Sequence, residues 1–250
     1  MKNTLKSRFW EIDFLRGLAV IIMIIYHIFF NLSIFGDYSF NTRSGLLLIM
    51  GRTAAIVFLT LVGISLYLSC SRGIKLFGKK PPFIKFFKKG VTIFSWGLII
   101  TLLTWTFTRD NFIIFGILHL IGLSIIISYP ILKLQRYNLF FAVPWIFGGF
   151  FLRKQTFNYP SLLWLGFIPG NYSSYDYYPL LPWFGFVLLG ISLGDIFYRN
   201  YVRKINLPDY SNLVFIKEIA ILGHYSLLIY LIHQPIIILI LQLTGLINLT

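Results

Sequence analysis

Arg16 and His27 are the two residues of this chain whose types and spacing point most directly to chemistry. Both lie in the run 14–35, which is otherwise almost wholly apolar. In an α-helix they would lie about three turns apart on one face, separated by about 16 Å along the axis. Ionisable groups inside a membrane are costly and usually functional. The pair therefore predicts a site that recognises a ligand near one membrane surface and carries out proton chemistry deeper in.

Three further ionisable residues, Arg52, His119 and Asp176, lie in or beside other apolar runs. With His27 they are expected to occupy one layer near the outer membrane surface. Burying an unpaired polar group in hydrocarbon costs free energy, so we expect these side chains to converge on a shared cavity. Two simpler interpretations stay open: His119 as an interhelical hydrogen-bonding residue, and Arg52 as a partner of Asp176 or of backbone carbonyls.

Polar and aromatic side chains near this layer are candidates for binding an acceptor substrate. Asn31 follows His27 by one helical turn, and Tyr230 and His233 share a face of the last apolar run. Asp176, Tyr178 and Trp183 stand together in the sequence at the start of the sixth run. The alternative for His233 is a buried histidine whose hydrogen bonds to other helices are satisfied. The alternative for the aromatic residues is the ordinary aromatic belt at the outer membrane interface.

The opposite mouth of the predicted site is strongly basic. Asp13 and Arg16 bracket the start of the first run, and the segment 72–89 carries seven cations, including Lys79, Lys80 and Lys88. These residues are predicted to form the binding site of a cytosolic donor, and the arginine and the lysines among them are predicted to bind its phosphates. A loop that sets membrane topology and contacts lipid is the alternative.

These residues require membrane-spanning elements to position them. The chain has 250 residues, 57% hydrophobic and 12% charged, where a soluble domain has roughly 25% charged residues. We predict an all-α, polytopic membrane helix bundle that forms a single integral-membrane domain over residues 1–250, placed as a multi-pass protein in the cell membrane. About seven transmembrane helices are expected, at 14–35, 46–70, 88–108, 112–132, 138–152, 178–198 and 219–247.

The distribution of positive charge predicts the orientation of these helices. Seventeen lysines and arginines fall on one side of the predicted spans, among them Lys2, Lys6 and Arg8, and four fall on the other. The positive-inside rule then places the N-terminus in the cytoplasm and the C-terminus outside. The net charge of +14 is thus explained by topology and contact with membrane lipid, and no nucleic-acid partner is expected. Cys70 is the single cysteine, and no metal site is expected from four scattered histidines.

Four segments together resemble the transmembrane acyltransferases: EIDFLRGLA at 11–19, FGILH at 115–119, DYYPLLPW at 176–183 and LGHYSLLIYLIHQP at 222–235. Arg16 and His27 have the spacing that marks the acyltransferase-3 family. The order of the segments is more similar to small prokaryotic members of the heparan-α-glucosaminide N-acetyltransferase family. The resemblance runs from Arg8 to Pro235.

The resemblance implies that an acyl group, expected to be acetyl, moves from cytosolic acetyl-CoA to a hydroxyl or amine of a glycan-type acceptor at the outer face. It implies that Arg16 and His27 are essential. His27 has the chemistry of a general base, and His119 and Arg52 have groups that stabilise an oxyanion or orient the acceptor. The stretch 36–45 has no histidine where the lysosomal enzyme has a proposed active one, so heparan is not transferred as the substrate. A homodimer is left open.

Two other classes of protein remain as alternatives. A transporter or channel for a small polar solute would use the same intramembrane residues to line a path. A non-catalytic membrane subunit would use them only for packing.

Overall fold

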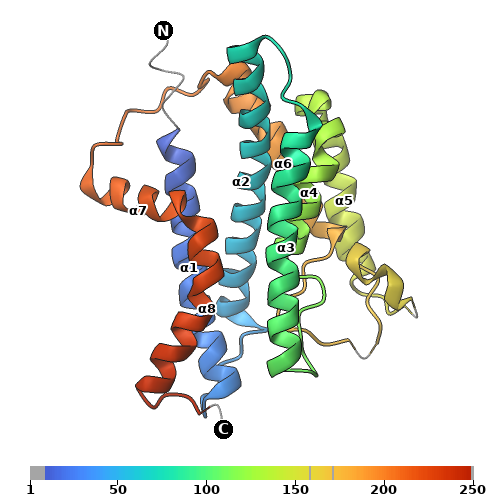
Figure 1. Ribbon diagram of the computed structural model, residues 1–250, viewed down its shortest axis with the longest axis vertical. Coiled ribbons are helices and arrows are strands. Elements are labelled where there is room, and N and C mark those ends of the chain that lie inside the picture. The colour runs from blue at the N-terminus through green and yellow to red at the C-terminus, as the bar shows by residue number, and fades with distance from the viewer. Residues whose placement is uncertain (1–8, 158, 171, 249–250) are drawn as a thin grey trace. The chain divides into compact units, whose positions relative to one another are not determined.

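The computed structural model describes residues 9–157, 159–170 and 172–248, and all regular structure within these ranges is helical (Figure 1). Six helices or merged helical stretches are long and apolar enough to cross a membrane. The all-α, multi-pass membrane architecture is therefore confirmed. The inward orientation of the N-terminus stays a prediction, and Lys2, Lys6 and Arg8, which support it, lie outside the described residues.

The chain divides into two compact units. Unit 1 combines the residues before Leu59 with those after Asn206, and unit 2 is Leu59–Asn206. Helix α2, Gly45–Phe77, contributes its first part to unit 1 and its second part to unit 2. The single domain expected over residues 1–250 stays a prediction.

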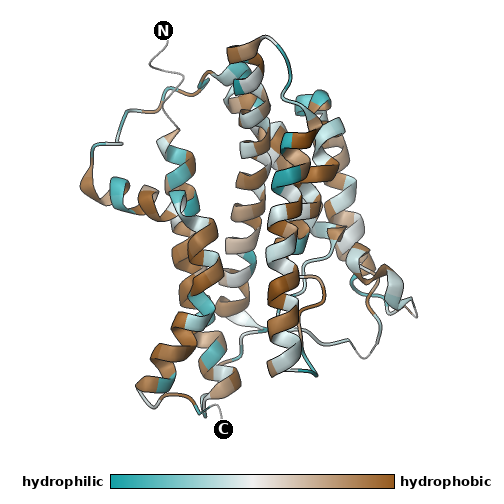
Figure 2. Cartoon of the chain, viewed as in Figure 1, coloured by the Kyte–Doolittle hydropathy of each residue, from teal (hydrophilic) through white to brown (hydrophobic). Residues whose placement is uncertain are grey.

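Unit 1 contains α1 (Trp10–Phe35), α7 (Val214–His224) and α8 (Ser226–Leu243) besides the start of α2. The last predicted span is thus two helices that meet at Tyr225. Helix α7 lies across α1, whereas α8 runs beside it (Figure 1). Figure 2 shows polar and apolar residues mixed along α7 and a mostly apolar α8.

Two glycines explain why α7 packs so closely on α1. A Cβ atom at Gly17 would overlap the carbonyl oxygen of Ile219, and one at Gly223 would overlap the carbonyl oxygen of Asp13. The crossing therefore fixes α7 against α1 immediately beside Arg16.

Unit 2 is built around α6. It contains α3 (Phe83–Phe107), α4 (Ile117–Ile131), α5 (Leu139–Leu152) and α6 (Leu180–Phe197), and the short 3-10 helices η1 (Leu132–Asn138), η2 (Pro160–Leu165) and η3 (Arg199–Tyr201). Helix α3 pairs with α4 and α5 pairs with α6. Val187 and Ile191 on α6 are fully buried.

Six candidate spans stand against the expected seven because α4 and α5 are counted together. The 3-10 helix η1, which contains Lys133, Gln135 and Arg136, joins them into one helical stretch over Ile117–Leu152. Helix α5 has 14 residues. It is about 21 Å long, shorter than a hydrocarbon core of about 30 Å. The fifth span is therefore short, in line with its predicted range of 138–152, and the count of seven stays a prediction.

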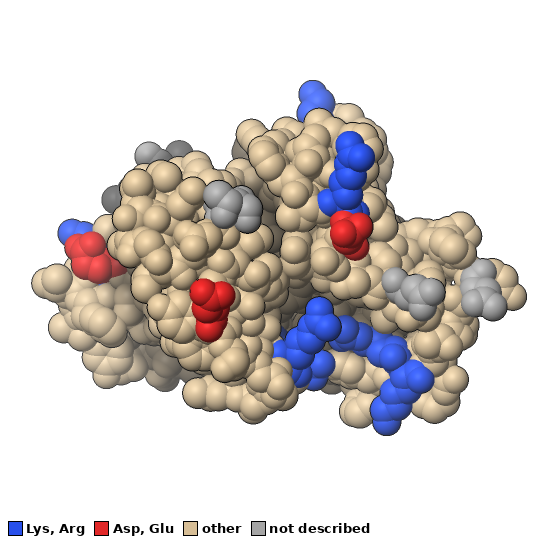
Figure 3. Space-filling view, turned by 90° about the horizontal axis from the view of Figure 1, so that it is seen from below, with Lys and Arg blue, Asp and Glu red and all other residues tan. Residues whose placement is uncertain are grey.

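Charged side chains are sparse over much of the surface. A view from below Figure 1 shows a few lysines and arginines and still fewer acidic residues among uncharged side chains (Figure 3). This pattern agrees with the charged fraction of 12% in the sequence.

Candidate functional site

His27 on α1 and His233 on α8 bring two imidazole rings of the predicted site into contact. Their ring centroids are 4.8 Å apart at an interplanar angle of 63°. Nδ1 of His27 lies 2.8 Å from the carbonyl oxygen of Met23, and Nδ1 of His233 lies 2.6 Å from that of Tyr230. His233 is 6% exposed, and its Nε2 atom has no hydrogen-bond partner. The contact therefore presents two imidazoles on neighbouring helices.

Two other predicted acceptor-binding residues lie beside this pair. Asn31 is 1% exposed, and its Nδ2 donates a 2.8 Å hydrogen bond to Oε1 of Gln234, the residue after His233. The ring of Tyr230 lies 5.3 Å from that of His233. The structure thus brings His27, Asn31, Tyr230 and His233 together along the α1–α8 contact.

Arg16 and Asp13 lie on α1 at the α7 crossing. Nη1 of Arg16 donates to Oδ1 of Asp13 over 3.0 Å, and both side chains are largely buried. A guanidinium group carries several N–H donors, the chemistry by which an arginine binds phosphate. Arg52 lies on the part of α2 that belongs to unit 1, and it is exposed.

His119 is a buried residue at the start of α4 in unit 2, 1% exposed. The backbone N–H of Gly116 donates to its Nδ1 over 3.2 Å, and Nε2 lies 3.4 Å from Oγ1 of Thr101. Thr101 in turn donates to the carbonyl oxygen of Ile113 over 2.6 Å. Because both ring nitrogens have partners within the protein, these contacts favour a role for His119 in fixing the start of α4.

Asp176 lies at the same helix start. Its Oδ2 accepts a 3.0 Å hydrogen bond from the backbone N–H of Ile117, and a negative charge is favourable at a helix N-terminus. A Cβ atom at position 116 would overlap this carboxylate, which explains Gly116. The structure thus brings Asp176 and His119 together, while His27 and Arg52 belong to unit 1.

Tyr178 and Trp183, the aromatic candidates for acceptor binding, contact each other with ring centroids 4.7 Å apart. Trp183 is 3% exposed, and its Nε1 has no hydrogen-bond partner. The backbone N–H of Tyr178 donates to the carbonyl oxygen of Phe115. Both residues therefore pack near the start of α4, on the same side of unit 2 as Asp176.

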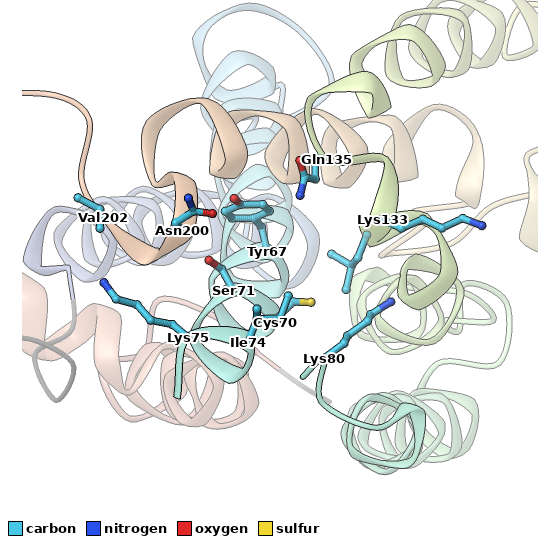
Figure 4. A pocket seen from close by; sticks show the side chains of 11 residues that line it. Tyr67, Cys70, Ser71, Ile74, Lys75, Lys80, Lys133, Gln135, Asn200 and Val202 are labelled. Atoms are coloured by element: carbon cyan, nitrogen blue, oxygen red, sulfur yellow. The ribbon is translucent and has the colours of Figure 1, made fainter. Parts of the chain in front are cut away.

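A pocket of about 560 Å³ opens where α2 ends and where η1 and η3 follow α4 and α6 (Figure 4). Tyr67, Ser71 and Lys75 reach it from α2, with Asn200 on one side and Gln135 on the other (Figure 4). Its lining is Tyr67, Cys70, Ser71, Ile74, Lys75, Lys80, Leu132, Lys133, Gln135, Asn200 and Val202. Three lysines with hydroxyl and amide groups make this pocket suited to an anion.

Lys80 is held in place at this pocket. Its Nζ donates to the carbonyl oxygen of Tyr129 over 2.7 Å and lies 3.7 Å from the centre of the Tyr129 ring. Burial lowers the pKa of the Lys80 ammonium, and the charge of Lys133 acts in the same direction. Lys79 and Lys88, which were predicted beside it, are exposed and do not line this pocket.

A buried carboxylate supports the wall of the pocket. Asp195 on α6 is 1% exposed, and its Oδ1 accepts a 2.8 Å hydrogen bond from the hydroxyl of Tyr67. Nε of Arg136 lies 3.3 Å from Oδ2, close enough for an ion pair but without hydrogen-bond geometry. Asp195 therefore connects α2, α6 and η1 around the pocket.

The backbone around the pocket is strained. Gln135 has φ 50° and ψ −125°, and Asn200 and Tyr201 both have φ 57°. Positive φ at residues other than glycine costs on the order of 1–3 kcal/mol and is concentrated at functional sites. Gln135 and Asn200 line the pocket, and the carbonyl of Tyr201 lies 3.5 Å from Nζ of Lys75.

Most of this pocket was not predicted from the sequence. Asp195 was a detectable signal, because it is one of only eight acidic residues and lies in an apolar run. Gln135 and Asn200 gave none, because they reach the pocket only through η1, η3 and their positive φ angles. Tyr67 gave none either, because its role depends on the tertiary contact of α2 with Asp195. Among the described residues, no group of three or more His, Cys, Asp or Glu is placed to hold a metal. The predicted absence of a metal stays a prediction.

Comparison with known proteins gives one match. The family model of the heparan-alpha-glucosaminide N-acetyltransferase catalytic domain matches residues 8–235. No curated protein and no solved structure matches the chain.

Proposed function

The chain belongs to the heparan-α-glucosaminide N-acetyltransferase catalytic family, and on this premise we propose that it transfers the acetyl group of cytosolic acetyl-CoA to a glycan-type acceptor at the outer face. Family membership and the apolar helices make it a multi-pass membrane protein of the acetyltransferase type. The donor, the acceptor and the residue roles below belong to the proposal.

The basic pocket of unit 2 is the proposed binding site for phosphate groups of CoA. The observation that carries this assignment is that Lys75, Lys80 and Lys133 all line one cavity that also offers hydroxyl and amide donors. Arg16, with Asp13 holding its guanidinium, is the second proposed phosphate-binding residue. Lys79 and Lys88 remain proposed contributors to the positive field that attracts the donor.

His27 is the proposed general base. Its Nε2 would take the proton of the acceptor hydroxyl or amine as the acceptor attacks the thioester carbonyl. The attack forms an oxyanion on the carbonyl oxygen, and Arg52 is proposed to stabilise it. Collapse of this intermediate re-forms the carbonyl, breaks the C–S bond and releases the thiolate of CoA. The contacts of His119 support a role in orienting the acceptor rather than in stabilising the oxyanion directly.

Two sets of residues are proposed as separate candidates for binding the acceptor, and each set is described within its own unit. In unit 1, Asn31, Tyr230 and His233 lie beside the base. In unit 2, Asp176, Tyr178 and Trp183 offer a carboxylate and aromatic faces, which suit a sugar.

Purified protein tests this function directly. We expect the protein in detergent or nanodiscs to release CoA thiol from acetyl-CoA and to place a radiolabelled acetyl group on glucosamine or glucose, used as the test amine and the test hydroxyl acceptor. A transporter, a channel or a non-catalytic subunit would give no covalently labelled product and no CoA release above the rate without protein.

A further inference from the structure

We propose that the basic pocket of unit 2 binds two separate phosphate groups of one nucleotide, one at each end of the pocket. Lys80 and Lys133 hold the first phosphate, and Lys75 holds the second. This inference rests on the proposed function, in which the donor is CoA, because the adenosine of CoA carries a 3′-phosphate and a 5′-diphosphate. It adds that the pocket recognises the nucleotide by both of its phosphorylated positions.

The three lysines of the pocket do not meet at one point. Figure 4 shows Lys75 on one side of the pocket, with Val202, and Lys80 and Lys133 on the other side. The Nζ atom of Lys75 lies 3.5 Å from the carbonyl oxygen of Tyr201, the last residue of η3. The pocket therefore has one basic end at η3 and another where η1 follows α4.

Lys80 and Lys133 together form the basic end beside α4. The Nζ atom of Lys80 donates to the carbonyl oxygen of Tyr129 and lies over its ring, so its ammonium is fixed near the end of α4. Burial lowers the pKa of Lys80, and the charge of Lys133 lowers it further, because two neighbouring ammonium groups repel each other. A phosphate bound at this end would offset the repulsion between the two charges.

The stretch between the two basic ends is uncharged. Of the described residues that line the pocket, three are lysines and none is acidic. Tyr67, Cys70, Ser71 and Ile74 of α2 lie between the ends (Figure 4). The pocket volume of about 560 Å³ falls within the range of about 300–1,000 Å³ for small-molecule sites. This arrangement suits a nucleoside with a phosphate on each side of it.

Two strained residues add amide groups to the same pocket. Gln135 and Asn200 line it with φ angles of 50° and 57°, a backbone conformation that costs free energy in residues other than glycine. Side-chain amides of this kind can pair with the ring nitrogen and the exocyclic amine of adenine. They favour a nucleotide over a lipid headgroup that carries two phosphates.

Binding of small nucleotides to the purified protein tests the two ends. Adenosine 3′,5′-bisphosphate carries both phosphates, whereas adenosine 5′-monophosphate and adenosine 3′-monophosphate each lack one. We expect wild-type protein in phosphatidylcholine nanodiscs to bind the bisphosphate at least about tenfold more tightly than either monophosphate, because each lysine–phosphate contact is charge-assisted. Equal dissociation constants for the three nucleotides in wild type would overturn the proposal.

Lys75→Ala and Lys133→Ala form a matched pair of variants, because both lysines line the pocket and both are exposed. We expect each variant to reduce its preference for the bisphosphate over one monophosphate by at least about threefold and to keep its preference over the other. The monophosphate concerned should differ between the two variants. Lys154→Ala, exposed and outside the pocket, should keep both preferences. If both pocket variants lose the same preference, or if neither loses one, the two-ended site is wrong.

Two further measurements separate this proposal from a lipid site and from the proposed function. Cardiolipin carries two phosphates in its headgroup, so it is compared with phosphatidylglycerol nanodiscs of equal charge. A bisphosphate affinity at least about tenfold lower in cardiolipin than in phosphatidylglycerol would assign the pocket to lipid and overturn the proposal. The expected pattern of nucleotide binding in protein that transfers no acetyl group would overturn only the proposed function.

Discussion

The hydroxyl of Tyr67 on α2, a residue that lines the basic pocket of unit 2, donates a 2.8 Å hydrogen bond to the buried carboxylate of Asp195 on α6. A carboxylate that is 1% exposed needs its donors, because a buried charge without partners is costly. The bond therefore links the stability of unit 2 to the shape of the pocket.

Removal of the Tyr67 hydroxyl should destabilise the protein. We expect Tyr67→Phe to lower the free energy of unfolding by about 1–3 kcal/mol, because it leaves one oxygen of Asp195 without its donor. Thermal unfolding in detergent measures the change. The exposed Tyr159→Phe is the control, and Asp195→Asn in the Tyr67→Phe background should recover part of the loss. Equal stability of the two tyrosine variants would contradict this role for the bond.

Lys80 should contribute to donor binding through its place in the pocket. We expect Lys80→Ala to raise the dissociation constant of CoA about tenfold, since one charge-assisted hydrogen bond to a phosphate is lost. Isothermal titration calorimetry with CoA measures this change. The exposed Lys154→Ala removes the same charge outside the proposed site and should bind CoA like wild type. If both variants weaken CoA binding equally, the overall positive charge of the protein attracts the donor, and Lys80 has no specific role in the pocket.

Donor binding should also depend on pH through the same residue. Burial lowers the pKa of Lys80 below its ordinary value of 10.5, so its charge is lost at a lower pH than that of an exposed lysine. The affinity for CoA should therefore fall as the pH rises, beginning below pH 10.5. Lys80→Arg keeps its charge over this range and should bind CoA with constant affinity. A parallel fall in both proteins would assign the effect to another group.

The crossing of α1 and α7 should tolerate no side chain at Gly223. A Cβ atom there would overlap the carbonyl oxygen of Asp13, so Gly223→Ala forces the helices apart. We expect a loss of about 1–3 kcal/mol in the free energy of unfolding. Gly148→Ala on α5 is the matched control, because an added Cβ meets no atom within 4 Å. Similar melting temperatures for the two variants would show that the crossing adjusts without cost.

Apolar patterning predicted the membrane architecture because long apolar runs determine which segments cross a bilayer. It placed the end of α1 correctly at Phe35. It did not reveal the break at Tyr225, because α7 is itself apolar enough to extend a span, and its separation from α8 depends on the tertiary contact between Gly223 and α1. The junction at η1 was also not predicted. It depends on the positive φ angle of Gln135, which no local sequence motif indicates.

The sequence predicted the candidate site only where an ionisable residue stands out in an apolar helix. His27 and His233 stand out as ionisable residues in apolar helices, but their contact depends on how α8 packs on α1. His119 gave the same signal, yet both of its nitrogens are satisfied by Gly116 and Thr101. The basic pocket is assembled from four separate segments, so neither the composition of the chain nor the spacing of its residues predicts it.

The most direct measurement of the central claim is acetyl transfer from acetyl-CoA to glucosamine or glucose by purified wild type, His27→Gln and His224→Gln. The account predicts that wild type and His224→Gln turn over at similar rates and that His27→Gln loses at least about 100-fold in kcat. Undiminished turnover in His27→Gln would contradict the assignment of His27 as the base, and no transfer by wild type would contradict the proposed reaction itself.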